Sequence, residues 1–109
     1  LAKKTGRIVA VCHVLRYAPY FVRLKELMHN GSIGNIISIQ HLEPIEHIHM
    51  SHSYVRGNWH NSKQTTPIIL AKSCHDLDIL RWLVDKPVQN IHAFGSLDWF
   101  TSKNAPQGS

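Results

Sequence analysis

Three hydrophobic runs along the chain have the pattern of β-strands. The first, residues 7–15, is continuous and rich in β-branched side chains, which predicts a buried strand. The second, residues 35–43, is rich in isoleucine and follows a glycine-containing turn. The third, residues 88–100, begins after Pro87 and has Gly95 as a point of interruption. We therefore expect three strands.

Two other stretches repeat their apolar residues at helical spacing. Pro19 suits the first turn of a helix, and Asn30 with Gly31 forms a stop signal, so the pattern predicts a helix over about 19–29. A second helix is expected to begin after Ser73. Apolar residues surround it nearly completely, which predicts burial against a sheet: Leu77, Ile79, Leu80, Trp82, Leu83 and Val84.

The order strand, helix, strand, loop, helix, strand predicts an α/β or α+β fold with helices packed on a sheet. Residues 44–67 lie between the second strand and the second helix and show no period. A loop of this length inside a compact domain is usually functional or disordered, and its aromatic and basic content argues against disorder. We therefore look for a binding site in it.

Composition narrows the classes of partner. The 109 residues carry a net charge of +5, but the lysines and arginines are scattered, and the tight cluster Lys3, Lys4 and Arg7 is not the basic stripe of a nucleic-acid binder. No apolar run reaches the roughly 20 residues that span a bilayer, so we expect no membrane partner. Cys12 and Cys74 have neither metal-site nor disulfide spacing, which favours a cytoplasmic location.

The segment KSCHDLDILRWL, residues 72–83, places titratable side chains at the start of the second helix. Ser73, followed three residues later by Asp76, is typical of a capping pair. His75 would lie beside the positive end of the helix dipole, which disfavours the imidazolium and predicts a largely neutral ring near neutral pH. A neutral imidazole can take a proton from a substrate hydroxyl and return it. The alternative is a structural histidine that bonds a backbone carbonyl.

Two further charged residues flank His75. Asp78 can share its helix face, where it either orients the imidazole ring or pairs with Arg81. Lys72 precedes the helix, and its ammonium group can polarise an oxygen at the same site.

The loop holds a second polar cluster, made of His47, His49, His52, Arg56, Trp59 and His60. On a strand, His47 and His49 would share a side, which is compatible with a metal site, but the chain has no HExxH motif and no cysteine ligand pair. A polar pocket for a hydroxylated ligand, with Trp59 as an apolar platform, is the more economical hypothesis. Chance histidines on an exposed loop are the third alternative. We expect no bound metal.

Four blocks follow one another along the chain: HVLRYAPYFVRLKELMHNGSIGNI, HSYVRGNWHN, ILAKSCHDLDILRWLV, and FGSLDWF with NAP. In this order they resemble the Gfo/Idh/MocA family of nicotinamide-dependent sugar and polyol oxidoreductases, from about residue 8 to residue 108. The RYxP-helix-GxIG block and the HDxD helix are the most specific parts of the resemblance.

The resemblance implies that residues 1–15 are the last strand of an amino-terminal Rossmann domain. It implies that residues 16–109 are part of a substrate and oligomerisation domain of α/β type, with a mostly antiparallel, open-faced sheet and helices packed on one side. The glycine-rich dinucleotide fingerprint is absent from these residues, as is the family's Glu-Lys-Pro motif. NAD or NADP would therefore be bound mainly by the amino-terminal domain.

The resemblance also implies roles for individual residues. His75 matches the family histidine that exchanges a proton with the substrate hydroxyl during hydride transfer. Many relatives carry an aspartate where Ala71 stands, which leaves Lys72 as a candidate substitute. Arg16 and Tyr17 match a turn near the nicotinamide, and the residues expected to contact substrate are His52, Arg56, Trp59 and Asp78.

The implied activity is hydride transfer between NAD or NADP and a carbon of a sugar or polyol. The implied assembly is a homo-oligomer formed through the exposed sheet face. Two alternatives stay open at this point: a non-catalytic sensing or assembly module on the same fold, and a histidine-rich metal-binding fragment.

Overall fold

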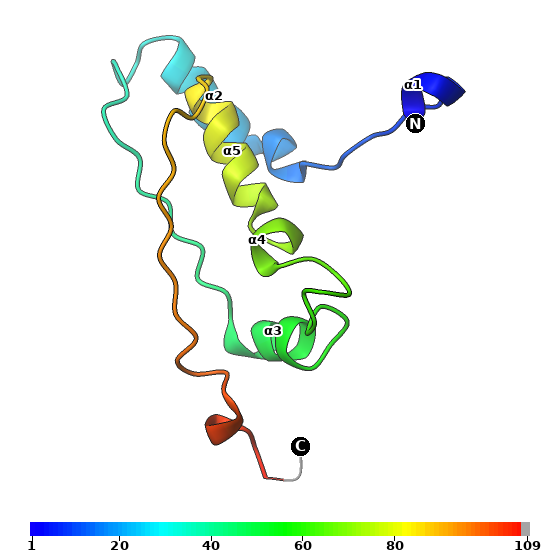
Figure 1. Ribbon diagram of the computed structural model, residues 1–109. Helices are drawn as coiled ribbons and strands as arrows, with labels where there is room; N and C mark the ends of the chain where they lie inside the picture. Colours follow the sequence, from blue (N-terminus) through cyan, green and yellow to red (C-terminus); the bar gives the residue numbers. More distant parts are fainter. Residues whose placement is uncertain (108–109) are drawn as a thin grey trace.

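Two helices, α2 and α5, lie side by side in the computed structural model, which describes residues 1–107 (Figure 1). Helix α2, Pro19–His29, has Pro19 in its first turn and ends at Asn30, and Gly31 follows with a left-handed φ of 79°. Helix α5, Cys74–Val84, ends at Asp85, whose φ of 56° is also left-handed. Both helices confirm the sequence predictions, because their start and stop signals are local.

The buried face of α5 is the core of the described chain. Ile79 is 0% exposed and Leu83 is 6% exposed, and these are its two buried hydrophobic residues. Asp76 lies on the same face, three residues before Ile79, and is also buried. Leu77 points away and is 54% exposed, so the expectation that this helix is buried nearly all round was wrong.

Lys25 ties α2 to the carboxyl end of α5. Its ammonium group donates hydrogen bonds to the carbonyls of Trp82 and Leu83 and lies 5.2 Å from the centre of the Trp82 ring. The last carbonyls of a helix have no partner within the helix, and its carboxyl end carries partial negative charge. The ammonium group of Lys25 therefore supplies the missing hydrogen bonds and the favourable positive charge. It also fixes the position of α2 relative to the end of α5.

The prediction of a mostly antiparallel, open-faced sheet was wrong for the described chain, because residues 1–107 contain no strand. The segments expected as strands are extended but make no ladder. In the first of them, Ile8 is 94% exposed, and in the third, Phe94 is 100% exposed. A β-branched run becomes a strand only when another segment supplies hydrogen bonds and packing, and no described segment does so here.

Several short helical elements lie where the sequence predicted strand or loop. The first predicted strand ends in a 3₁₀ turn, and the loop over 44–67 contains helical turns. These elements are α1 (Ala2–Thr5), η1 (Val14–Tyr17), α3 (His47–Met50), the π-helical turn η2 (Ser51–Val55), α4 (Ile68–Ala71) and the 3₁₀ turn η3 (Ser102–Asn104). Most are too short to show a hydrophobic period, so pattern reasoning missed them.

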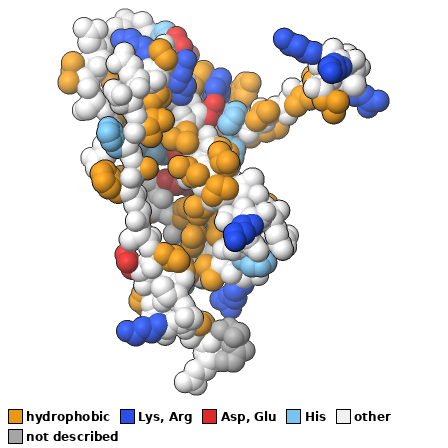
Figure 2. Space-filling view, in the orientation of Figure 1, with side chains coloured by type: hydrophobic (Ala, Val, Ile, Leu, Met, Phe, Trp, Pro, Cys, Tyr) orange, Lys and Arg blue, Asp and Glu red, His pale blue; other side chains and the backbone are white. Residues whose placement is uncertain are grey.

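The chain is open in shape. Its radius of gyration is 18.3 Å, against about 13 Å for a compact chain of this length. Helix α1 stands away from the body on an extended arm, and in Figure 2 its lysines lie apart from the other side chains. Two extended segments, 35–46 and 87–98, run from the helix pair toward the α3 end of the molecule (Figure 1). Within residues 1–107, no helix has both the length and the apolar character to cross a membrane.

Candidate functional site

A cluster of four polar side chains forms where η1 meets the first turns of α5. Arg16 lies in the η1 turn and His13 occupies the N-cap position just before it, while His75 and Asp78 come from α5. In each pair the residues are three apart, and residues at this spacing share a side of a helical turn. The two elements contact each other, so the pairs face one another. We refer to these four residues as the His75 cluster.

Arg16 and Asp78 form a bidentate ion pair within the cluster. Arg16 Nε donates to Asp78 Oδ2 at 2.7 Å, and Nη2 donates to Oδ1 at 2.5 Å. These hydrogen bonds hold the pKa of Asp78 below its ordinary value, against the opposing effect of burial, and the nearby positive charges lower it further. The same hydrogen bonds raise the pKa of Arg16. Asp78 thus pairs with Arg16 and not with Arg81, the partner considered from sequence.

The two imidazoles of the cluster pack edge to face. The ring centres of His13 and His75 are 5.9 Å apart, with an angle of 79° between the planes. Nδ1 of each ring is buried and has no hydrogen-bond partner among the described residues. Buried polar atoms almost always have a hydrogen-bond partner. Two neighbouring rings that each carry a buried nitrogen without one are therefore an exception of the kind found at catalytic sites. His75 Nδ1 therefore does not make the backbone bond of the structural alternative.

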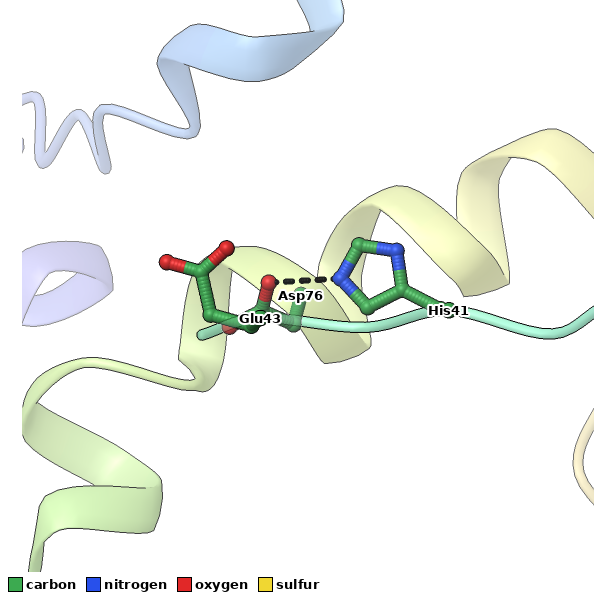
Figure 3. A group of neighbouring side chains, drawn as sticks. All are labelled: His41, Glu43 and Asp76. Atoms are coloured by element: carbon green, nitrogen blue, oxygen red, sulfur yellow. Dashed lines mark hydrogen bonds and ion pairs between the residues drawn. The ribbon is translucent and has the colours of Figure 1, made fainter. Parts of the chain in front are cut away.

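The opposite side of the first turn of α5 faces the extended segment 35–46. His41 Nε2 donates to Asp76 Oδ1 at 2.8 Å, and Figure 3 shows the ring pointing at this carboxylate, with Glu43 beside it. Lys72 Nζ donates to Glu43 Oε1 at 2.9 Å. Each carboxylate thus has its own nitrogen partner. The two pairs, His41–Asp76 and Lys72–Glu43, connect segment 35–46 to the start of α5.

These contacts correct the capping interpretation of Ser73 and Asp76. Ser73 occupies the N-cap position, but its side chain makes no capping hydrogen bond, and its φ and ψ of −75° and 0° are not extended. Asp76 is in the first turn, as expected, but on the buried face, where its charge needs a partner and finds His41. The spacing of Ser73 and Asp76 is compatible both with a capping pair and with the observed contact of Asp76 with His41, so the sequence alone does not distinguish them.

Lys72 is held as a cation. Its hydrogen bond to Glu43 raises its pKa above the ordinary value, and the charges of Glu43 and Asp76 act in the same direction, against burial. At neutral pH this side chain can donate hydrogen bonds and stabilise negative charge but cannot act as a base.

Three of the residues expected to contact substrate line one pocket. His52, Arg56 and Trp59 surround a pocket of about 620 Å³, formed by α3, η2 and the turn after them. Gly57 lets this turn close, because a Cβ at that position would collide with the backbone oxygens of His52 and Ser53. The pocket is lined neither by His75 nor by Asp78, so the structure does not join it to the His75 cluster.

The sequence argument that His47 and His49 share a side does not hold in the structure. His47 and His49 lie on helix α3, where residues two apart point to different sides, and not on a strand. His60 Nδ1 donates instead to the carbonyl of Gly57 at 2.6 Å.

Sequence reasoning named His75, Asp78 and Arg16, and the structure brings these three together. Tyr17 follows Arg16 in η1, but its side chain is exposed. His13 was not predicted as a site residue, because a strand over residues 7–15 would have separated it from Arg16. The signal was present as the i, i+3 spacing of two polar residues before Pro19.

The Arg16–Asp78 pair predicts a pH dependence of stability. Because the pKa of Asp78 is lower in the folded chain than in the unfolded chain, its charge contributes stability above about pH 5 that is lost as the pH falls through the native pKa. We expect Asp78→Asn to lower the free energy of unfolding at neutral pH and to lower it less in acid, as the pH falls toward the native pKa of Asp78, as measured by urea unfolding at a neutral and an acidic pH. Asp98→Asn, on an exposed segment where Asp98 bonds Ser96, is the control. Equal losses at both pH values would contradict this role.

Comparison with known proteins gives the chain relatives. The sequence profile described as "Oxidoreductase family, C-terminal alpha/beta domain" (GFO_IDH_MocA_C) matches residues 25–108. A Bacillus subtilis (strain 168) protein named "Putative oxidoreductase YteT" is 28% identical over 100 residues, which cover 91% of this chain and 23% of that protein. The chain thus spans about a quarter of the length of this relative. No solved structure matches the chain significantly.

Proposed function

The chain belongs to the Gfo/Idh/MocA oxidoreductase family, and from this premise we propose that it is the substrate-side part of an NAD(P)-dependent oxidoreductase. The proposed reaction moves a hydride between the nicotinamide and a hydroxyl-bearing carbon of a sugar or polyol. The observation that supports it most directly is the His75 cluster, in which the half-buried imidazole of His75 keeps a buried Nδ1 without a hydrogen-bond partner, while Arg16 clamps the carboxylate of Asp78 three residues along the same helix.

In this proposal the chain's own residues handle the proton. His75 accepts the proton of the substrate hydroxyl as the carbon is oxidised and returns it in the reverse direction. Asp78 provides fixed negative charge near the imidazoles, and Arg16 keeps that carboxylate ionised and in place. Lys72 is held as a cation by Glu43 on the opposite side of the first turn, and its proposed contribution is positive charge in the surroundings of the site, at a distance from the reacting oxygen.

The residues present fit only the nicotinamide end of the cofactor. The Tyr17 side chain is 81% exposed, so its ring is free to pack against a flat heterocycle. Arg16 is already engaged by Asp78, and its proposed contribution is to orient that residue. No glycine-rich phosphate-binding loop occurs in the sequence. When bound, the nicotinamide supplies the hydride acceptor.

We propose that the pocket of His52, Arg56 and Trp59 receives the part of the sugar or polyol remote from the reacting carbon. An aromatic ring beside donors and acceptors suits a molecule with apolar ring faces and many hydroxyl groups. We expect Trp59→Ala in the intact protein to raise KM about tenfold with a smaller change in kcat. Steady-state kinetics with the best substrate would check this, and a fall in kcat alone would contradict a binding role.

The test of the proposed function is a substrate screen with the intact protein. Sugars and polyols are offered with NAD or NADP, and the appearance of reduced nicotinamide is followed by absorbance. The expected result is turnover with at least one compound of this class. If calorimetry shows that a sugar binds but no turnover is seen, the oxidoreductase proposal is rejected in favour of a non-catalytic sensing or assembly module.

We also propose that the intact protein self-associates. The sequence expectation placed this contact on an exposed sheet face, which the described residues do not form, so the proposal needs another surface. What supports it is the apolar surface of the extended segment 87–98, where Ile91 is 80% exposed and Phe94 is 100% exposed. Isolated apolar residues on a surface are normal, but a row of them along one segment is typical of an interface. A monomer at micromolar concentration in analytical ultracentrifugation would contradict this.

A further inference from the structure

His13 is the member of the His75 cluster to which the proposed function gives no task. Its ring packs edge to face with that of His75, and its Nδ1 lies 3.6 Å from Asp78 Oδ2. The groups that face it are therefore the imidazole of His75, the carboxylate of Asp78 and the guanidinium of Arg16. The side chain is 29% exposed, so part of the ring reaches the surface.

The charges around the two imidazoles are balanced. Arg16 and Asp78 carry opposite charges and are joined by two hydrogen bonds, so the cluster is neutral when both imidazoles are neutral. One added proton gives the cluster a single positive charge, with Asp78 close to His13 to stabilise it. A second proton would place two imidazolium groups with ring centres 5.9 Å apart, which repulsion disfavours.

The unpaired nitrogens allow this proton to move. Nδ1 of His13 and Nδ1 of His75 are both buried and make no hydrogen bond among the described residues, although Nδ1 of His13 lies 3.6 Å from Asp78 Oδ2. A nitrogen committed to a structural hydrogen bond could not exchange protons freely, and neither of these is so committed. An imidazole accepts a proton at one nitrogen and releases one from the other, so two neighbouring rings can pass a proton from a buried position to an exposed one.

We propose that His13 is the proton relay partner of His75. In the oxidation direction, the substrate O–H bond breaks as His75 gains the proton, and the hydride leaves for the nicotinamide of the proposed function, on which this inference rests. His75 then gives up a proton to His13, directly or through one water, and His13 releases it to solvent. The reverse reaction takes a proton from solvent by the same route.

The first test is an equilibrium measurement that does not need turnover. In the intact protein labelled with ¹⁵N-histidine, NMR is used to titrate His75 in the wild type and in His13→Gln, with His29→Gln, at an exposed position of α2, as the control. The expected result is that His75 titrates in two coupled steps in the wild type and in a single step in His13→Gln. Identical His75 curves in the two proteins would overturn the proposal, even if the enzyme proves active.

The second test is kinetic. We expect His13→Ala to lower kcat about tenfold, with KM changed by less than about a factor of two, and added imidazole to restore much of the lost kcat. A merely structural role would give a loss that imidazole does not rescue, and that result would overturn the relay. If the wild type turns over no substrate, the proposed function fails, and the NMR titration still decides whether the two histidines share a proton.

Discussion

Replacing His75 by alanine should lower kcat of the intact protein about 10²- to 10⁴-fold, the usual contribution of a positioned general acid–base group. The physical reason is that the proposed proton route begins at His75, and His13 receives the proton only from His75. Asp78 is held ionised with a lowered pKa, which makes it a weak base, and Arg16 is a permanent cation. The loss should be found in kcat across pH 6 to 9, measured by steady-state kinetics of reduced nicotinamide.

The control for this prediction is His29→Ala, which removes an exposed imidazole from α2 and should leave kcat unchanged. His75→Gln keeps a hydrogen-bonding side chain of similar size without a titrating nitrogen, so it separates loss of the base from loss of packing. Thermal unfolding of each variant shows whether the fold survives. Full kcat in both His75 variants would remove this residue from the mechanism.

Replacing Ile79 by alanine should destabilise the intact protein by about 2 to 4 kcal/mol. Ile79 is the fully buried side chain of the described chain, and the cavity that alanine leaves would lie where α5 packs inward. Few other buried side chains are present nearby to fill it, because Leu83 is the second buried hydrophobic residue among residues 1–107. Denaturant unfolding followed by circular dichroism would measure the loss.

Leu77→Ala is the matched control for Ile79. It removes a branched side chain of the same size from the same helix, but from the solvent side, where Leu77 is 54% exposed. Its cost should stay below about 1 kcal/mol, since little apolar area is lost. Equal losses for the two variants would mean that α5 is buried on both faces in the intact protein.

What the sequence predicted correctly depends on local interactions. The helix over 19–29 follows from Pro19 at its start, Gly31 after its end and the apolar period between them, and the second helix follows from its apolar period and the break at Pro87. The strands depended on partners elsewhere. The β-branched run 7–15 has the composition of a strand but finds no neighbour among residues 1–107, and it ends in a helical turn.

The candidate site also has a part that local spacing predicted and a part that depends on long-range contacts. His75 and Asp78 were found because their spacing on one helix is visible in the sequence. The partner of Asp78 was not, since Arg16 lies 62 residues away and only the packing of η1 on α5 brings it close. The contact between Lys72 and Glu43 crosses 29 residues and was missed for the same reason. Contacts between residues far apart in the sequence depend on how the elements pack together. The spacing of residues within one element gives no information on that packing.

The bare backbone of the two extended segments has a consequence for amide hydrogen exchange. Between Asn35 and Ile45, and again between Lys86 and Asp98, the described chain makes no backbone–backbone hydrogen bond. Their amides should therefore exchange with D₂O near the rate of an unfolded peptide, while those in the middle of α5 are protected by the helix and its core. In the intact protein, slow exchange in either segment would reveal where another part of the molecule, or a second copy of it, lies against the chain.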